Sequence, residues 1–190
     1  DYLPDALVNF MALLGWHPED NTEIFTLAQL VDKFDLERVQ KGGAIWNTEK
    51  LDWVNKEHLK KMNYELRIMN YEKELQKSGI LNYRKEILEK IEPVITERIN
   101  KFGDIKDLTE RGELGFFFGQ PTWKKEDFLW KGEGEVKDVI RRLEEVAKLL
   151  GELDENSFTK ESVKNAIWPY ADREGRGMVL WPTRYALSGL

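Results

Sequence analysis

Basic and aromatic side chains are the residues of this sequence whose types and spacing point most clearly to chemistry. They fall in three stretches, which are NKEHLKKM, TERINKFGDIK and the C-terminal segment around WPTRYALSGL. Their members are Lys56, Lys60, Lys61, Arg98, Lys101, Lys106, Trp181, Arg184 and Tyr185. Lysine binds phosphates through charge, whereas arginine near an aromatic ring can hydrogen-bond a base edge and stack on its face. A polyanion is therefore one candidate ligand, and ordinary solvated helix faces are the alternative.

The sequence contains no group of residues with the types and spacing typical of a catalytic site. The two histidines are His17 and His58, and neither has a second histidine or a cysteine at metal-ligand spacing. We therefore expect both to be surface residues. The segment EGEGEVK contains glycine but carries acidic charge, which would repel a phosphate, so it is typical of a turn before a helix. The sequence predicts no catalytic residue, no metal ligands and no cofactor in this chain, and a protein that works by binding.

Composition narrows the class of protein. The chain has 190 residues, of which 41% are hydrophobic, enough to build a folded core. Its formal net charge of −6 argues against a protein that grips nucleic acid through overall charge, but a selective binder with local basic patches remains open. There is no cysteine for a disulfide framework. No apolar run reaches the ~20 residues that a membrane span needs, and we expect a cytoplasmic protein.

Apolar residues that recur at three and four positions predict a mainly all-α fold. The expected helices cover residues 6–14, 27–34, 71–77, 83–101, 104–113, 135–150, 160–168 and 177–190. Thr26, Asn82 and Thr159 are expected N-caps. Residues 48–62 are expected to form two short helices that meet near Asn55, which caps the second while Trp53 fills the core. At most a minor β element is expected near residues 42–47.

A larger pattern resembles a known family. YLPDALVNFMALLGWHPED, followed by EIFTLAQLVDKFDLERVQKGGAIWNTEKLDWVN, is similar to the segment after the catalytic domain of bacterial glutamyl-tRNA synthetases, densely over residues 1–62. ITERINKFGDIKDL, FFF and PTRYALSGL are similar, more loosely, to that family's anticodon-binding region. The resemblance predicts two domains, and so does the change near residue 65 to long helices rich in charged residues. These are a stem-contact region at 1–65 and a helical anticodon-binding domain at 66–190.

The resemblance also implies roles for particular residues. Arg98 matches an arginine that reads the third anticodon base, and Arg184 matches one that packs on the first anticodon bases. Trp181 stands where some members have a glutamine, so it is expected either to stack on a base or to belong to the core. Contacts to the tRNA stem and its phosphates are expected from Lys56, Lys60, Lys61 and Lys101.

The implied parent protein is a class I aminoacyl-tRNA synthetase that uses ATP and Mg²⁺ to attach glutamate to tRNA-Glu, with tRNA-Gln as an open second substrate. The nucleotide-binding signatures of that family are absent from this sequence. We therefore expect a piece of a longer protein, cut at both ends, monomeric and inactive alone. An all-α module that binds protein instead of RNA is the alternative function.

Overall fold

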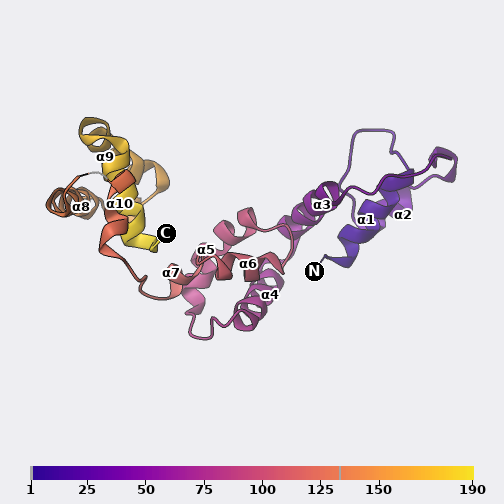
Figure 1. Cartoon of the computed structure of the whole chain (residues 1–190). Helices are drawn as coiled ribbons and strands as arrows, with labels where there is room; N and C mark the ends of the chain where they lie inside the picture. The colour runs from indigo at the N-terminus through magenta and orange to yellow at the C-terminus, as the bar shows by residue number, and fades with distance from the viewer. Residues whose placement is uncertain (1, 133) are drawn as a thin grey trace. The chain divides into compact units, whose positions relative to one another are not determined.

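The computed structural model describes residues 2–132 and 134–190, and its regular elements are helices (Figure 1). The chain divides into two compact units, residues 1–111 and 112–190, which we call unit 1 and unit 2. The predicted all-α fold is confirmed. In the described residues the predicted β element at 42–47 has no counterpart, and a single antiparallel bridge pairs Trp16 with Val39. The predicted domain boundary near residue 65 stays a prediction. The two compact units divide at a different point, between residues 111 and 112.

Unit 1 carries the elements that present the lysines and Arg98. They are α1 (Pro4–Gly15), α2 (Leu27–Lys33), η1 (Leu36–Arg38), α3 (Thr48–Lys61), α4 (Tyr64–Lys77), α5 (Lys85–Arg98) and α6 (Asp104–Glu110). The Thr26 side chain caps α2 and forms a capping box with Gln29, as the sequence predicts. The predicted cap at Asn82 is wrong, because α5 begins after Arg84. No helix in the described residues is long and apolar enough to cross a membrane.

The packing of α1 against α3 corrects the prediction for residues 48–62. These residues form one helix, because its buried stripe of Leu51, Val54 and Leu59 continues without a break. Asn55 lies in that stripe, fully buried, and is not a cap. Its Oδ1 accepts a hydrogen bond from Leu3 N at 2.7 Å, and its Nδ2 donates to Asn100 O. The residue therefore ties the start of α1 to the segment after α5.

Trp53 also differs from its expected place. Its side chain is 41% exposed, whereas Leu51 and Val54 on either side of it in the sequence are buried. The core of this part of unit 1 is formed instead by Ala6 and Phe10 of α1 against those two α3 residues. A helix turns by about 100° per residue, so Trp53 falls on the face opposite this core.

A buried polar network joins α3, α4 and α5. Arg67 of α4 donates to Glu92 of α5 through Nε and to the carbonyl oxygens of Leu59, Lys60 and Met62 through Nη1. Those carbonyls belong to the C-terminal end of α3, where a helix leaves acceptors without partners. One arginine therefore fixes the end of the lysine-bearing helix relative to the helix that ends in Arg98.

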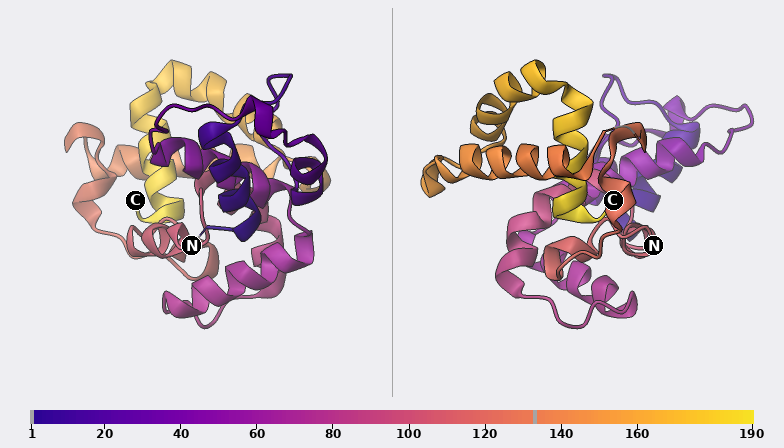
Figure 2. Two further views of the ribbon diagram at one scale, coloured as in Figure 1. Left: turned by 90° about the vertical axis from the view of Figure 1, so that its right-hand side faces the viewer. Right: turned by 60° about the vertical axis from the view of Figure 1, so that its left-hand side comes forward.

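Unit 2 is built from α7 (Gly115–Phe118), η2 (Lys125–Phe128), η3 (Trp130–Gly132), α8 (Val136–Gly151), η4 (Glu155–Ser157), α9 (Lys160–Glu174) and α10 (Arg176–Ser188). The predicted cap at Thr159 is confirmed and forms a capping box with Ser162. α8, α9 and α10 pack on one another around Val146, Ile167 and Val179. A sharp turn joins α9 to α10 (Figure 2). Gly175 lies at this turn with a φ of +98°, which favours glycine.

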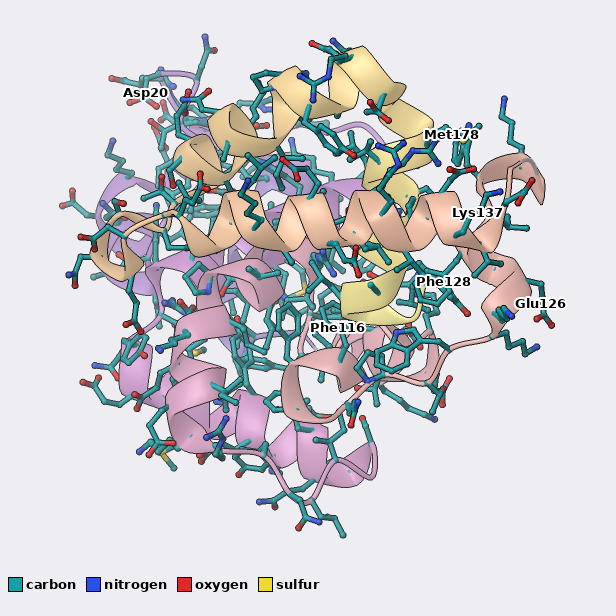
Figure 3. The ribbon with its side chains drawn as sticks, turned by 90° about the vertical axis from the view of Figure 1, so that its left-hand side faces the viewer. Asp20, Phe116, Glu126, Phe128, Lys137 and Met178 are labelled. Atoms are coloured by element: carbon teal, nitrogen blue, oxygen red, sulfur yellow. The ribbon has the colours of Figure 1, made fainter. Side chains whose placement is uncertain are left out.

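Trp130 holds the connection between α7 and α8, within unit 2, against the start of α10. Its ring lies on the backbone of Gly177, where a Cβ atom would overlap the indole. The same ring meets Trp181 one helical turn further on, with centroids 5.8 Å apart. Phe128, two residues before Trp130 and labelled in Figure 3, packs edge-on against Tyr185 with ring centroids 4.8 Å apart. The stretch 123–130 therefore packs along α10 and fixes which side of that helix is exposed.

Candidate nucleic-acid interface

The ends of α3 and α5 bring two predicted residues of unit 1, Lys56 and Lys60, to the same glutamate. Lys56 and Lys60 of α3 both reach Glu97, the neighbour of Arg98 at the C-terminal end of α5. Lys56 Nζ donates to the Glu97 carbonyl oxygen at 2.5 Å and lies 4.0 Å from its carboxylate. Lys60 Nζ lies 3.8 Å from the same carboxylate and 3.1 Å from Glu57. Two of the predicted stem-contact lysines therefore meet at the residue that precedes Arg98 in α5.

Glu97 is the member of this surface that sequence reasoning missed. Its carboxylate is 70% exposed and lies between two lysines from another helix. Surface ion pairs of this kind contribute at most about 1 kcal/mol, so a phosphate could replace the carboxylate at little cost. No pattern in the sequence marks the pairing, because it depends on how α3 and α5 pack.

Lys101 belongs to a separate cluster at the start of α6. Its Nζ lies 3.4 Å from Asp104 and 3.6 Å from Asp52, and 5.4 Å from the centre of the Tyr2 ring. Burial alone would lower the pKa of Lys101, but Asp104, Asp52 and Tyr2 outweigh it and raise the pKa above its ordinary value. Lys101 is therefore a cation already held by two carboxylates, in contrast to exposed Lys61.

His58 is not the surface residue that the sequence predicts. Its Nε2 lies 2.9 Å from Asn9 Oδ1, and Asn9, fully buried in α1, also bonds the backbone at Glu23 and Phe25. Burial lowers the pKa of His58, with Lys61 adding to the effect and Asp5 opposing it. His58 also lines a cleft of about 530 Å³ with Lys61 and Phe102. The histidine thus links α3 to the loop before α2.

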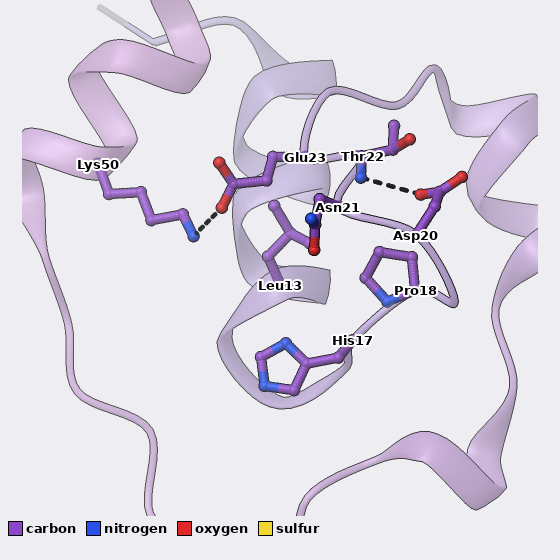
Figure 4. A pocket seen from close by; sticks show the side chains of 8 residues that line it. All are labelled: Leu13, His17, Pro18, Asp20, Asn21, Thr22, Glu23 and Lys50. Carbon is purple, nitrogen blue, oxygen red and sulfur yellow. Dashed lines mark hydrogen bonds and ion pairs between the residues drawn. The ribbon is translucent and has the colours of Figure 1, made fainter.

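His17 is exposed, as predicted, and lies at an open polar pocket of about 440 Å³ (Figure 4). In this pocket Lys50 Nζ pairs with Glu23 at 2.6 Å, and Thr22 N donates to Asp20. Within residues 2–132 and 134–190, no three or more His, Asp or Glu side chains are grouped so that they could hold a metal ion.

Unit 2 presents Arg184 on α10. The helix buries Val179, Pro182 and Tyr185, which lie on one face, and Arg184 is exposed beside that face. Tyr185 fixes the helix, because its hydroxyl accepts from Lys124 N at 3.0 Å and donates to Asp127 Oδ2 at 3.2 Å. Arg184 therefore projects from a braced backbone and offers a planar fork of donors to solvent.

Trp181 is half-buried and already engaged. Its Nε1 donates to Asp127 O at 2.8 Å, and its ring stacks parallel to that of Tyr185, with centroids 6.4 Å apart. Since an indole has one donor, Trp181 keeps none for a base edge. Arg98 and Arg184, the two predicted readers, lie in different units.

The all-α fold is that of the class of anticodon-binding domains. Residues 57–190 match the family model described as the anticodon binding domain. Residues 1–53 match the model described as the catalytic domain of class I tRNA synthetases (E and Q). The chain belongs to the anticodon-binding-domain family of these synthetases, and the resemblance seen in the sequence is confirmed.

The individual proteins to which the chain is similar include glutamate–tRNA ligases. The chain is 30% identical to a glutamate–tRNA ligase of Clostridium botulinum and 33% identical to one of Bacillus licheniformis, over 99% of this chain and 38% of each relative. It is also similar to the crystal structure of a glutamate tRNA ligase from Elizabethkingia meningosepticum in complex with its amino acid. There the TM-score is 0.73 at 30% identity, covering 99% of this chain and 36% of that one. The chain thus spans less than two fifths of these relatives.

Proposed function

We propose that this chain is the tRNA-binding part of a glutamate–tRNA ligase, with tRNA-Glu as its RNA partner. The observation that carries the proposal is the family match over 57–190, which includes both exposed arginines at braced helix positions. In this proposal the rest of the ligase supplies the ATP- and Mg²⁺-dependent attachment of glutamate to the tRNA 3′ end. The chain itself acts by binding, as a monomer in the cytoplasm.

The proposed division of labour follows from the chemistry of the side chains. Arg98 and Arg184 contact unpaired anticodon bases, because a guanidinium combines a rigid donor fork with a flat face for stacking. Lys56, Lys60 and Lys61 contact backbone phosphates of the stem, where charge without base readout is sufficient. Lys56 and Lys60 exchange the carboxylate of Glu97 for a phosphate in the complex.

The test is fluorescence anisotropy of the chain with a tRNA-Glu transcript and with a copy in which the third anticodon base is changed, at two salt concentrations. The native anticodon is expected to bind more tightly, by about 1–3 kcal/mol, and Arg98→Ala is expected to remove that preference. Tighter binding at low salt is expected for both transcripts, since phosphate contacts release counterions.

Arg84→Ala is the matched control. Arg84 is an exposed arginine at the opposite end of the same helix, so the variant removes an equal charge from α5. It is expected to keep the anticodon preference. Absence of tRNA binding by the folded chain at low salt would reject the proposed function. Equal binding to both transcripts would reject the role of Arg98.

A further inference from the structure

The cleft beside His58 combines apolar walls with a few polar groups. It has a volume of about 530 Å³ and lies between the start of α1, the loop before α2, the end of α3 and the first turns of α4. Its apolar walls are formed by Leu3, Ile24, Phe25, Met62, Leu66 and Phe102. A cavity of this size with a mainly apolar lining and a few convergent polar groups is typical of a site for a small organic group. We call it the His58 cleft.

Asn9 fixes which ring nitrogen of His58 carries the proton. Asn9 Oδ1 accepts from Phe25 N at 2.8 Å and Asn9 Nδ2 donates to Glu23 O at 3.0 Å, so backbone partners set the orientation of the amide. His58 Nε2 lies 2.9 Å from the same Oδ1 and must therefore be a donor. Burial favours the neutral ring, because it lowers the pKa of His58. In a neutral imidazole with a proton on Nε2, the other nitrogen is an acceptor.

His58 Nδ1 is thus an acceptor whose position is fixed and whose lone pair is available. Within residues 2–132 and 134–190 nothing bonds it, and the protein does not enclose it. Lys61 is exposed and forms no ion pair in the same part of the chain. The two residues are three apart on α3, so they share one face of that helix, and both line the cleft. Asp5 adds a carboxylate from α1.

A nucleotide has the groups that complement this cleft. Its base has apolar faces, the exocyclic amine of cytosine or adenine is a donor, and its phosphate is an anion for a lysine. A ribose hydroxyl is a donor for the Asp5 carboxylate. Proteins that recognise RNA commonly take unpaired bases out of the stack and read their edges.

We propose that the His58 cleft binds one unpaired nucleotide of RNA. Its base bears an exocyclic amine and lies against the apolar walls, with the amine on His58 Nδ1 and the phosphate at Lys61. The proposal rests on the proposed function, to which it adds a base contact in unit 1 apart from Arg98.

NMR spectra of the imidazole rings test the cleft, since His58 and His17 are the two histidines of the chain. Spectra are recorded for the chain alone and with cytidine monophosphate, uridine monophosphate or inorganic phosphate. In the chain alone, His58 Nδ1 is expected to carry no proton. Cytidine monophosphate is expected to shift the His58 signals and to bind several-fold more tightly than uridine monophosphate, which has a carbonyl oxygen in place of the amine. The signals of His17 are expected to stay unchanged.

Two pairs of variants test the walls and the cation of the cleft. Leu66→Ser and Lys61→Gln are each expected to weaken binding of cytidine monophosphate several-fold. Met69→Ser on the same helix as Leu66 is the control for the wall, because Leu66 and Met69 are 47% and 62% exposed and Met69 lies outside the cleft. Lys73→Gln, at an exposed lysine of α4, is the control for charge. Both controls are expected to bind as the unchanged chain does.

Three outcomes of these titrations would overturn the proposal: a proton on His58 Nδ1, equal binding of the two nucleotides, or the same shift with inorganic phosphate alone. The tRNA-Glu transcript is then added and is expected to shift the His58 signals as cytidine monophosphate does. A shift with the nucleotide but not with a transcript that binds would assign the cleft to free nucleotides and overturn the RNA contact. Binding of the transcript is measured by anisotropy, so that result leaves the proposed function standing, whereas a chain that binds no tRNA fails the proposed function itself.

Discussion

Arg67 Nε lies 2.5 Å from Glu92 Oε1 inside unit 1, and the two side chains are only 11% and 8% exposed. The carboxylate also accepts from Thr96 Oγ1 at 2.7 Å, and Thr96 in turn bonds the hydroxyl of Tyr71. Burial raises the pKa of Tyr71 to about 12, so its hydroxyl stays protonated in this network at neutral pH. The pair thereby fixes α4 and α5 to the end of α3.

Glu92→Leu is expected to lower the free energy of unfolding by about 3–5 kcal/mol, because it leaves the guanidinium of Arg67 buried without its carboxylate. The double variant Arg67→Met/Glu92→Leu is expected to recover part of that loss, since it removes both charges. Urea denaturation followed by circular dichroism measures both. A double variant less stable than Glu92→Leu would contradict this account.

Asn55→Ala is expected to destabilise the chain by about 2–3 kcal/mol, because it leaves Leu3 N and Asn100 O without their partner in the interior. Asn47→Ala, which removes the N-cap of the same helix, is the comparison and is expected to cost about 1 kcal/mol. Thermal and urea unfolding of the two variants decide the order. A smaller loss for Asn55→Ala than for Asn47→Ala would count against its role as a tie.

Glu97→Gln is expected to strengthen tRNA binding a few-fold, because it removes a carboxylate that competes with phosphate for Lys56 and Lys60. The dependence of log K on log salt should become steeper as these lysines neutralise phosphates more fully. Anisotropy titrations at several salt concentrations give both quantities. Glu86→Gln removes the same charge from the other end of α5, so an equal gain there would point to net charge alone.

Stability is expected to fall as pH drops below about 6.5, and His58 is the reason. Burial lowers the pKa of His58 from 6.5, so below this value the unfolded chain binds a proton that the folded chain takes up less readily. The contribution of neutral His58 to the free energy of unfolding is fully present above the pKa of the unfolded chain. It is lost as pH falls towards the lower pKa of the folded chain. Asp5 and Lys61 are the charged groups that act on the ring.

Unfolding free energies at pH 7.5 and 5.5 measure this dependence. His58→Gln is expected to reduce the difference between the two values, because it removes the titrating ring. The same substitution at exposed His17 controls for loss of a histidine in general. A comparable reduction in His17→Gln would contradict the assignment to His58.

Arg184→Lys is expected to keep the salt dependence of tRNA binding and to lose base preference worth about 1–3 kcal/mol, since lysine keeps the charge without the planar fork. The side chain is exposed, so unfolding should be unchanged within about 0.5 kcal/mol. Anisotropy against transcripts that differ at the first anticodon bases tests the effect. Arg141→Lys on α8 is the matched control, and a similar loss of preference there would remove Arg184 from the site.

The sequence predicts the helices well where the signal is local. The apolar periodicity of 135–150 and the caps at Thr26 and Thr159 all have their counterparts in the structure. The start of α5 was predicted too early. Asn82 has a good cap side chain, but α5 begins three residues later.

The buried polar residues carry a signal in the sequence. Asn9, Asn55 and Glu92 each occupy a position in the apolar stripe of a helix, where a polar side chain needs an internal partner. Their partners could not be named, because Asn100 and Arg67 reach them only through tertiary packing. The exposure of Val31 could not be predicted either. Val31 lies in the apolar stripe of its helix, which is the pattern of a buried residue, yet its side chain is 76% exposed.

The contact between Trp130 and Gly177 makes two distant positions share one volume. Neither can enlarge alone, because any side chain at 177 would need the space that the indole fills. Among relatives, a larger residue at 177 should therefore coincide with a smaller one at 130. An engineer who transplants α10 into another scaffold must carry the segment around Trp130 with it, or refill the space beside the glycine.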